Sequence, residues 1–133
     1  MIGVVVATHG KLAEEMIRTA EAVVGHLDQV APLSVVATAP DMRSDLKAAI
    51  ARVDQGDGVL LLTDLLGGSP TNLCVSFLAE RKVEVVTGVN LPMLLKLGSL
   101  RASGKPIGQL ARDLVEAGQR AIGHVSENLR SLG

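Results

Sequence analysis

Two short apolar runs limit what this chain can fold into. Residues 2–7 and 58–63 are almost wholly apolar, and runs of this length are typical of strands that are buried on both faces. Residues 30–36 and 83–87 show weaker strand patterns, and Pro32 favours an edge position for the first of them. A strand buried on both faces needs helices on both sides of its sheet, so we expect an α/β fold.

The segments that follow the strands carry apolar residues at helical spacing. Four repeats of strand and helix imply right-handed crossovers and a mainly parallel sheet. Small and polar residues at 99–105 predict a mobile stretch. Because Gly118 and Gly123 weaken the last helix, the structure of 121–125 is ambiguous, and the segment is either a short extra strand or the tail of that helix. The predicted helices cover 11–24, 42–53 after an Asp41 cap, 71–79, a short segment opened by Asn90, and most of 106–132.

The composition narrows the class of protein. The 133 residues predict a single domain, 1–133, with a core of Val, Leu, Ile and Ala, because aromatic residues make up only 1%. The net charge of −1 offers no basic surface for nucleic acid. No apolar run approaches the roughly 20 residues of a spanning helix. The single cysteine excludes an internal disulfide, and we therefore expect a cytoplasmic protein.

Two residues that directly follow strands predict the chemistry. His9 comes after the first strand and Asp64 after the third, and ligands of parallel sheets bind beyond the carboxyl ends of the strands. If these strands are neighbours, about 4.8 Å apart, the two side chains lie within hydrogen-bond reach. A carboxylate on one ring nitrogen fixes the tautomer and leaves the other nitrogen nucleophilic. The competing interpretations are a histidine of the surface or core and an aspartate that only caps a helix or forms a turn.

Small residues around this pair predict phosphate binding. Gly10 lets the backbone approach a phosphoryl group closely, and the helix that follows offers free N–H groups. Gly67, Gly68 and Ser69, with Pro70 at the first helical position, supply a second helix start. The two glycines are equally suited to turn geometry alone, and Ser69 fits an N-cap better than a nucleophile.

The remaining candidates carry weaker signals. His26 follows a helix end and is expected at the surface, His124 has no evident partner, and Cys74 fits apolar packing. No spacing of these residues is typical of a metal site. Residues 98–105 imitate a P-loop, but the glycine spacing is one residue too long and Pro106 replaces the magnesium-binding hydroxyl. We therefore expect no metal, nucleotide or other cofactor.

Three motifs resemble one family. They are Ala-Thr-His-Gly at 7–10, Thr-Asp-Leu-Leu-Gly-Gly-Ser-Pro-Thr-Asn at 63–72 and Thr-Gly-Val-Asn-Leu-Pro-Met-Leu at 87–94. Together with the element order, they resemble the IIA component (EIIA) of the mannose-type sugar phosphotransferase system (PTS). The resemblance implies a flavodoxin-like doubly wound sheet in strand order 2-1-3-4. It also implies that His9 is the phosphorylated residue and Asp64 its hydrogen-bonding partner.

The resemblance further implies partners. A cytoplasmic EIIA takes phosphate from phospho-HPr and gives it to an EIIB, which phosphorylates sugar entering through a membrane EIIC/EIID complex. The best-known members exchange a C-terminal strand within a homodimer, so we expect a homodimer, with 121–125 as the ambiguous exchanged segment. Leu66 replaces a Trp that some members carry, which changes the rim of the site. No linker or EIIB domain follows, so we expect a separate EIIB polypeptide.

Two other functions stay open on the sequence alone. A regulatory module would use phosphorylation of His9 to change its affinity for a kinase or transcription regulator, without sugar flux. A hydrolase would combine Ser69, His9 and Asp64, but the sequence around Ser69 lacks the glycine spacing of a nucleophile elbow. The sequence identifies neither the sugar that would be transported nor the choice between transport and signalling.

Overall fold

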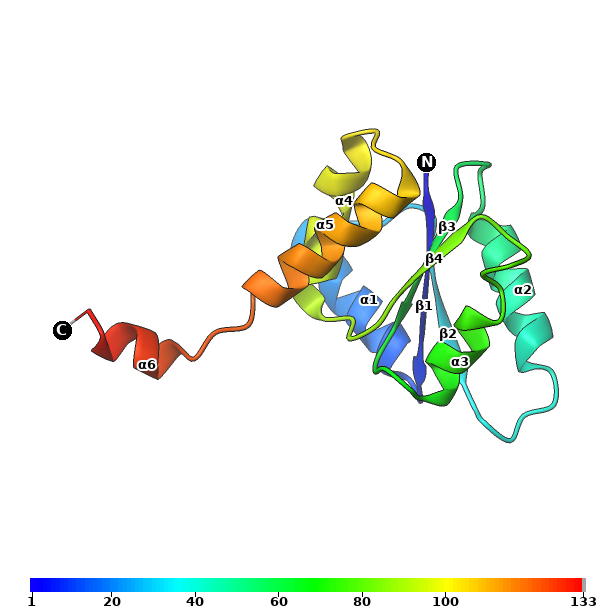
Figure 1. The fold of residues 1–133 in the computed structure, drawn as a ribbon, viewed down its shortest axis with the longest axis horizontal. Coiled ribbons are helices and arrows are strands. Elements are labelled where there is room, and N and C mark those ends of the chain that lie inside the picture. Colours follow the sequence, from blue (N-terminus) through cyan, green and yellow to red (C-terminus); the bar gives the residue numbers. More distant parts are fainter. Residues whose placement is uncertain (133) are drawn as a thin grey trace.

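The computed structural model describes residues 1–132, which form one four-stranded sheet between helices (Figure 1). The strands are parallel and follow the order β2-β1-β3-β4. The predicted α/β class and strand order are confirmed. The elements are β1 (Gly3–His9), α1 (Leu12–Val24), β2 (Val30–Val35), α2 (Met42–Val53), β3 (Val59–Thr63), α3 (Ser69–Val75), β4 (Val83–Val86), α4 (Leu91–Ala102), α5 (Ile107–Arg120) and α6 (Val125–Arg130).

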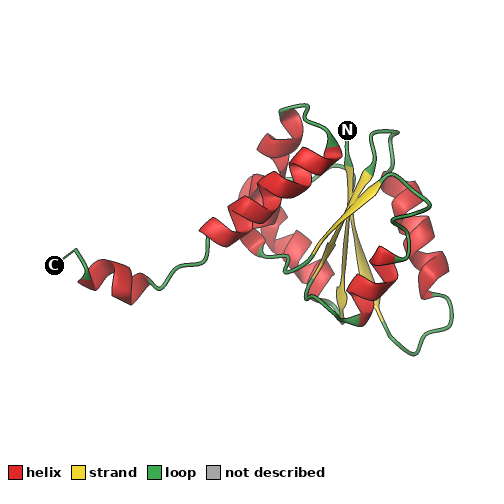
Figure 2. Ribbon diagram, in the orientation of Figure 1, coloured by secondary structure: helices red, strands yellow, loops and turns green. Residues whose placement is uncertain are grey.

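Helices cover both faces of the sheet, as the apolar runs predict (Figure 2). One core joins the sheet to α1, α4 and α5, and the other joins it to α2 and α3. Alternate residues of β1 point to opposite faces, so that Val4 lies in the first core and Val5 in the second, both fully buried. Aliphatic residues fill most of these cores, with Met93 in the first and Cys74 and Phe77 in the second.

The register of the sheet places the predicted site. β1 and β3 are neighbours, with Ala7 opposite Thr63, so the residues after these two positions emerge at the same edge. His9 ends β1 and Asp64 directly follows β3. β2, which contains Pro32, pairs only with β1 and is an edge strand, as predicted. β4 forms the opposite edge.

Two predictions about the second half of the chain are wrong in detail. The stretch 99–105 is not a loop throughout, because α4 continues to Ala102 and packs Leu97 and Leu100 against the core. The segment 121–125 is neither a strand nor the tail of α5: α5 ends at Arg120, and Val125 begins α6. Figure 1 shows α6 extending away from the body of the molecule.

The glycine at 118 has a different role from the one its helix propensity suggests. A Cβ at Gly118 would lie 2.5 Å from the Met93 Cε atom, so the absence of a side chain lets α5 pack closely against α4. The side-chain amide of Asn90 donates to the Gly118 carbonyl at 3.1 Å in the same contact. The glycine therefore belongs inside α5 and does not end it.

The start of α3 and the cap of α2 also differ from expectation. Gly68 occupies the N-cap position of α3, and Ser69 is its first helical residue, so the predicted Ser69 cap is wrong. Pro70 consequently takes the second helical position, and the helix ends at Val75 where the prediction extended to 79. Asp41 does precede α2, but its side chain makes no capping hydrogen bond.

Candidate functional site

The structure brings His9 and Asp64 into direct contact at the carboxyl edge of the sheet. The Nδ1 atom of His9 lies 2.8 Å from Oδ2 of Asp64, and the backbone N–H of His9 donates to the same oxygen at 3.0 Å. The other carboxylate oxygen accepts from the backbone N–H of Leu65 at 3.1 Å. The side chain of Asp64 is 10% exposed, whereas that of His9 is 52% exposed. The carboxylate is therefore fixed, and the ring beside it stays accessible.

Hydrogen bonding keeps Asp64 ionised. Burial alone raises the pKa of this carboxyl, but the bonds from the ring and backbone of His9 outweigh it, and the pKa lies below the ordinary value of 3.8. A carboxylate accepts and does not donate, so Nδ1 of His9 carries the ring proton. The lone pair of the neutral ring then lies on Nε2, which is the nucleophilic nitrogen.

The backbone of Gly68 passes directly beside the ring of His9. A Cβ at this position would lie 3.0 Å from Cε1 and 3.6 Å from Nε2 of His9, so only glycine leaves this edge of the ring free. Gly67 precedes it with φ of +84°, and Gly10 follows His9 with φ of +54°, both in the region that favours glycine. The glycines thus serve the turns, and Gly68 also makes space next to Nε2.

Threonine side chains that the sequence analysis did not single out hold the two loops of the site. The hydroxyl oxygen of Thr8, fully buried, accepts from the backbone N–H of Ala13 at 2.8 Å and ties the start of α1 to the end of β1. On the other side, the hydroxyls of Thr63 and Thr71 lie 2.6 Å apart, and Thr71 donates to the Leu65 carbonyl at 2.7 Å. In the sequence, the only indication of this role was that these threonines lie close to the predicted site residues.

The other histidines and the cysteine lie away from this edge. His26 is exposed and pairs with Glu21 and Asp28, as expected for a surface residue. The expectation that His124 lacks a partner is wrong, because its Nδ1 atom lies 2.7 Å from Glu127. Cys74 is buried, which confirms its packing role, and desolvation raises the pKa of its thiol to about 12.

The arrangement does not assemble the hydrolase considered above. Within residues 1–132, no hydrogen bond joins the Ser69 hydroxyl to the ring of His9, whose side-chain partner is Asp64. No three His, Cys, Asp or Glu side chains of this described range are grouped to hold a metal ion. None of its helices has both the length and the apolar character that crossing a bilayer requires.

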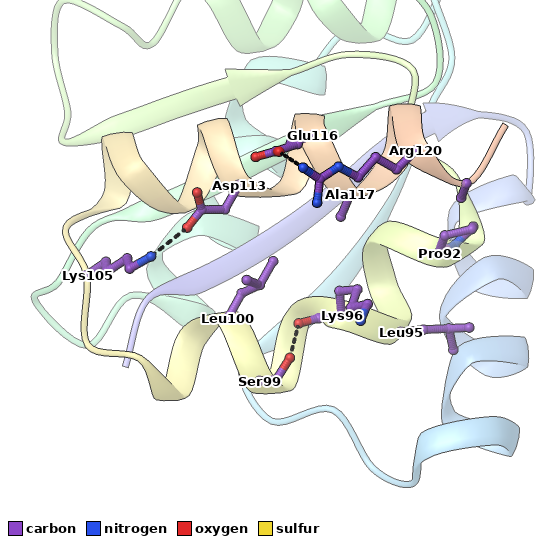
Figure 3. Close-up of a pocket in the computed structure, with 11 residues that line it drawn as sticks. Pro92, Leu95, Lys96, Ser99, Leu100, Lys105, Asp113, Glu116, Ala117 and Arg120 are labelled. Atoms are coloured by element: carbon purple, nitrogen blue, oxygen red, sulfur yellow. Dashed lines mark hydrogen bonds and ion pairs between the residues drawn. The ribbon is translucent and has the colours of Figure 1, made fainter.

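A groove of about 750 Å³ between α4 and α5 is separate from the histidine site (Figure 3). Four of its charged groups form two pairs, because Lys105 lies 3.3 Å from Asp113 and Arg120 contacts Glu116. Lys96 lies on the α4 side of the groove. Figure 3 shows these pairs along the α5 side of the groove, with Leu95 and Leu100 on α4. His9 and Asp64 do not line this groove.

Fold and site together define a parallel α/β protein with a carboxylate-oriented histidine at the carboxyl edge of its sheet. The family model described as PTS system fructose IIA component, EIIA-man, matches residues 3–115. The chain belongs to this family.

Individual relatives agree with this assignment. The mannose-specific EIIAB component of Escherichia coli K12 is 32% identical over 124 residues, which are 91% of this chain and 38% of that protein. The PTS IIA protein associated with the fucose utilization operon of Streptococcus pneumoniae is 32% identical, with a TM-score of 0.80 over 96% of this chain and 95% of its own. The EIIA from Streptococcus agalactiae is 26% identical, with a TM-score of 0.86 over 96% and 99%. The chain thus spans well under half of the curated E. coli relative.

Proposed function

We propose that this protein is a cytoplasmic phosphocarrier of the sugar PTS, which accepts a phosphoryl group on His9 from phospho-HPr and passes it to an EIIB. The EIIB then serves a membrane EIIC/EIID complex. The observation that carries the proposal is the contact of His9 Nδ1 with an ionised, largely buried Asp64 carboxylate, while the ring stays half exposed. Family membership supplies the donor and acceptor classes.

The geometry suits a transfer between two histidines. The Nε2 lone pair of His9 attacks the phosphorus of the donor's phosphohistidine, so that one N–P bond forms while the donor's N–P bond breaks. The ring of His9 becomes positively charged during attack, and the Asp64 carboxylate stabilises that charge through Nδ1–H. The reverse sequence, with the acceptor's nucleophile attacking the same phosphorus, restores the neutral ring.

Two helix starts beside His9 support the proposal that backbone groups bind the phosphoryl oxygens. The first N–H groups of a helix have no partner within the helix, and α1 and α3 both begin at this edge. Gly10 and Gly68 allow these backbones to approach, and Ser69 adds a hydroxyl at the start of α3. In this proposal Gly10, Gly67, Gly68 and Ser69 together bind the transferred phosphoryl group.

Exposed leucines beside the site support a protein as the donor. Leu66 is 80% exposed and Leu65 is 49% exposed, and both belong to the turn that carries Asp64. Apolar side chains at such exposure, next to a reactive group, are typical of a surface that a partner covers. A small phosphorylated metabolite would not need them.

Phosphoenolpyruvate-dependent labelling tests the proposal. Incubation with phosphoenolpyruvate and the general phosphotransfer proteins is expected to add one acid-labile phosphate to the wild type and none to His9→Ala. His26→Ala is the matched control, because it removes an exposed carboxylate-paired histidine elsewhere, and it is expected to label fully. Labelling of His9→Ala at the wild-type level, or of the wild type without HPr, would contradict the proposal.

We also propose that the protein is a homodimer in which the C-terminal segment of each subunit covers the β4 edge of the other. β4 pairs only with β3, and an open groove of about 520 Å³ lies between this strand and α3. Within residues 121–132, the described part of the chain after α5, the large apolar side chains are all exposed in their own subunit. These side chains are Ile122, Val125, Leu129 and Leu132.

The mass in solution tests the dimer. Size-exclusion chromatography with light scattering is expected to give twice the chain mass for the full protein and the single mass for a variant truncated after Arg120. A monomeric full-length protein at micromolar concentration would contradict the proposal. A dimeric truncated variant would show that other surfaces form the interface.

A further inference from the structure

The turn that carries Asp64 is held by the side-chain hydroxyl of a buried residue of α3, Thr71. Between the end of β3 and the start of α3, residues 64–68 form no regular structure. The Thr71 hydroxyl reaches back from α3 and donates to the Leu65 carbonyl at 2.7 Å. Thr71 is only 4% exposed, so its hydroxyl has little access to water as an alternative partner.

A second hydroxyl fixes the direction of this bond. The hydroxyl oxygens of Thr63 and Thr71 lie 2.6 Å apart, and Thr63 is fully buried. A hydroxyl has one proton, and that of Thr71 goes to the Leu65 carbonyl, which cannot donate. Thr63 therefore donates to Thr71. The two bonds form a chain from the last residue of β3, through α3, to the turn.

Leu65, the residue that follows Asp64, is held through both of its backbone polar groups. The backbone N–H of Leu65 donates to Oδ1 of Asp64, and the carbonyl of Leu65 accepts from Thr71. A rotation of this residue would move the carboxylate whose other oxygen binds Nδ1 of His9. Gly68, whose backbone lies beside the ring of His9, closes the same turn.

We propose that Thr71 is a positioning residue for phosphoryl transfer, which acts through the Leu65 carbonyl to hold Asp64 in the orientation that fixes the His9 tautomer. This inference rests on the proposed function. The Thr71 hydroxyl bonds to Thr63 and to the Leu65 carbonyl and not to His9, so its effect is on the orientation of the pair. Loss of the hydroxyl frees the turn, and Nδ1 of His9 then loses its fixed acceptor.

Three variants separate the hydroxyl from the volume of the side chain. Thr71→Val keeps the shape and removes the hydroxyl, Thr71→Ser keeps the hydroxyl and removes a methyl, and Thr87→Val makes the same hydroxyl-to-methyl change at a half-buried position after β4. With phospho-HPr as donor, we expect Thr71→Val to lower kcat about tenfold at unchanged KM, because a small misplacement of a catalytic pair is costly. Thr71→Ser and Thr87→Val are expected within about twofold of the wild type.

A second readout does not depend on phosphoryl transfer. Nitrogen-15 NMR of the unphosphorylated protein reports which ring nitrogen of His9 carries the proton in the neutral form. We expect Nδ1–H in the wild type, in Thr71→Ser and in Thr87→Val, and a mixture of both tautomers in Thr71→Val. If the role of Thr71 were merely structural, Thr71→Val would have a lower melting temperature but would keep the single Nδ1–H tautomer of the wild type.

The outcomes distinguish this inference from the proposed function. Wild-type kcat and a single tautomer in Thr71→Val would overturn the positioning role and leave the phosphocarrier function intact. Equal losses in Thr71→Ser and Thr71→Val would also overturn it, because the hydroxyl would not be the cause. Should Thr71→Val not fold, Thr71→Ser carries the test, and a mixed tautomer there overturns the inference. A wild type that phospho-HPr does not label refutes the proposed function, while the NMR result still decides the role of Thr71.

Discussion

The carboxyl edge of the sheet and the C-terminal segment each contain a histidine bound to a carboxylate at almost the same distance. His9 lies 2.8 Å from Asp64, and His124 lies 2.7 Å from Glu127. The carboxylate side chain is 10% exposed at the sheet edge and 74% exposed in the C-terminal segment. The two pairs have nearly the same distance between histidine and carboxylate, but they differ in how far the carboxylate is exposed to solvent.

The difference shows what turns an ion pair into a site. Asp64 accepts from the ring and backbone of His9 and from the backbone of Leu65, so its position is fixed by the end of β1 and by its own turn. Glu127 meets His124 only as its neighbour three positions along a short helix. An exposed pair of that kind gains little, because water solvates both members and both side chains lose freedom. The largely buried carboxylate, with its fixed position, is therefore the feature that distinguishes the His9 pair from the His124 pair.

Removing the charge of each carboxylate should give the largest contrast between the two regions. Asp64→Asn replaces the acceptor at Nδ1 with a group that can also donate, which favours the wrong tautomer, and we expect phosphoryl transfer to fall on the order of 10²-fold or more. Glu127→Gln, the matched change in the C-terminal segment, should leave the rate within about twofold. Rapid-quench measurement of transfer from phospho-HPr gives both rates.

The same comparison has a clear contrary result. If Asp64→Asn transferred phosphate at the wild-type rate while remaining folded, the carboxylate would have no part in the chemistry, and His9 would differ from His124 only in its location.

A methyl group added in each region should give the next largest contrast. In Gly68→Ala the new Cβ meets Cε1 of His9 at 3.0 Å, so either the ring or the turn must shift, and we expect transfer to slow by about 10-fold or more. In Gly123→Ala the nearest atom is the Asn128 side-chain nitrogen at 3.7 Å, an ordinary contact, and no change is expected. Equal rates for the two variants would show that the ring of His9 does not need the space beside Gly68.

Acid unfolding should give the smallest effect, and it isolates the buried carboxylate. Burial opposes the ionisation of Asp64, but the bonds from His9 outweigh it and hold the folded pKa below 3.8. The stabilisation is therefore complete above the unfolded value and is lost as pH falls through the folded pKa. Urea titrations of the wild type and Asp64→Asn should show a free-energy difference that shrinks as pH falls below about 4. A difference that grows on acidification would contradict the direction of this pKa shift.

The site itself was largely predictable from the sequence, because its two principal residues directly follow buried strands. Neighbouring parallel strands end at one edge, so His9 and Asp64 needed only the adjacency of their strands to meet. The hydrogen bonds of Thr63 and Thr71 were not predictable, because they depend on how α3 packs against the turn that precedes it. The path of that turn follows from Gly67 at positive φ and Gly68 at the N-cap.

The second half of the chain shows why local composition misleads. The small residues around Ser99 and Ser103 suggest mobility, but Leu97 and Leu100 pack into the core and extend α4 past Ser99. The hydroxyls of both serines then bond to carbonyls within their own helical turns. Tertiary packing determines where this helix ends, and the helix propensities of single residues do not include that contribution. The His124 pair was missed because a helix beginning at Val125 was not foreseen beside Gly123.

The site of phosphorylation tests the central claim most directly. Phosphorus and nitrogen-15 NMR of protein phosphorylated by phosphoenolpyruvate and the general phosphotransfer proteins identify both the residue and the ring nitrogen that carry the phosphate. The contact between Nδ1 and Asp64 predicts a single phosphate on Nε2 of His9. A phosphate on Nδ1 of His9, or on His124 or His26, would contradict the role assigned to the buried carboxylate.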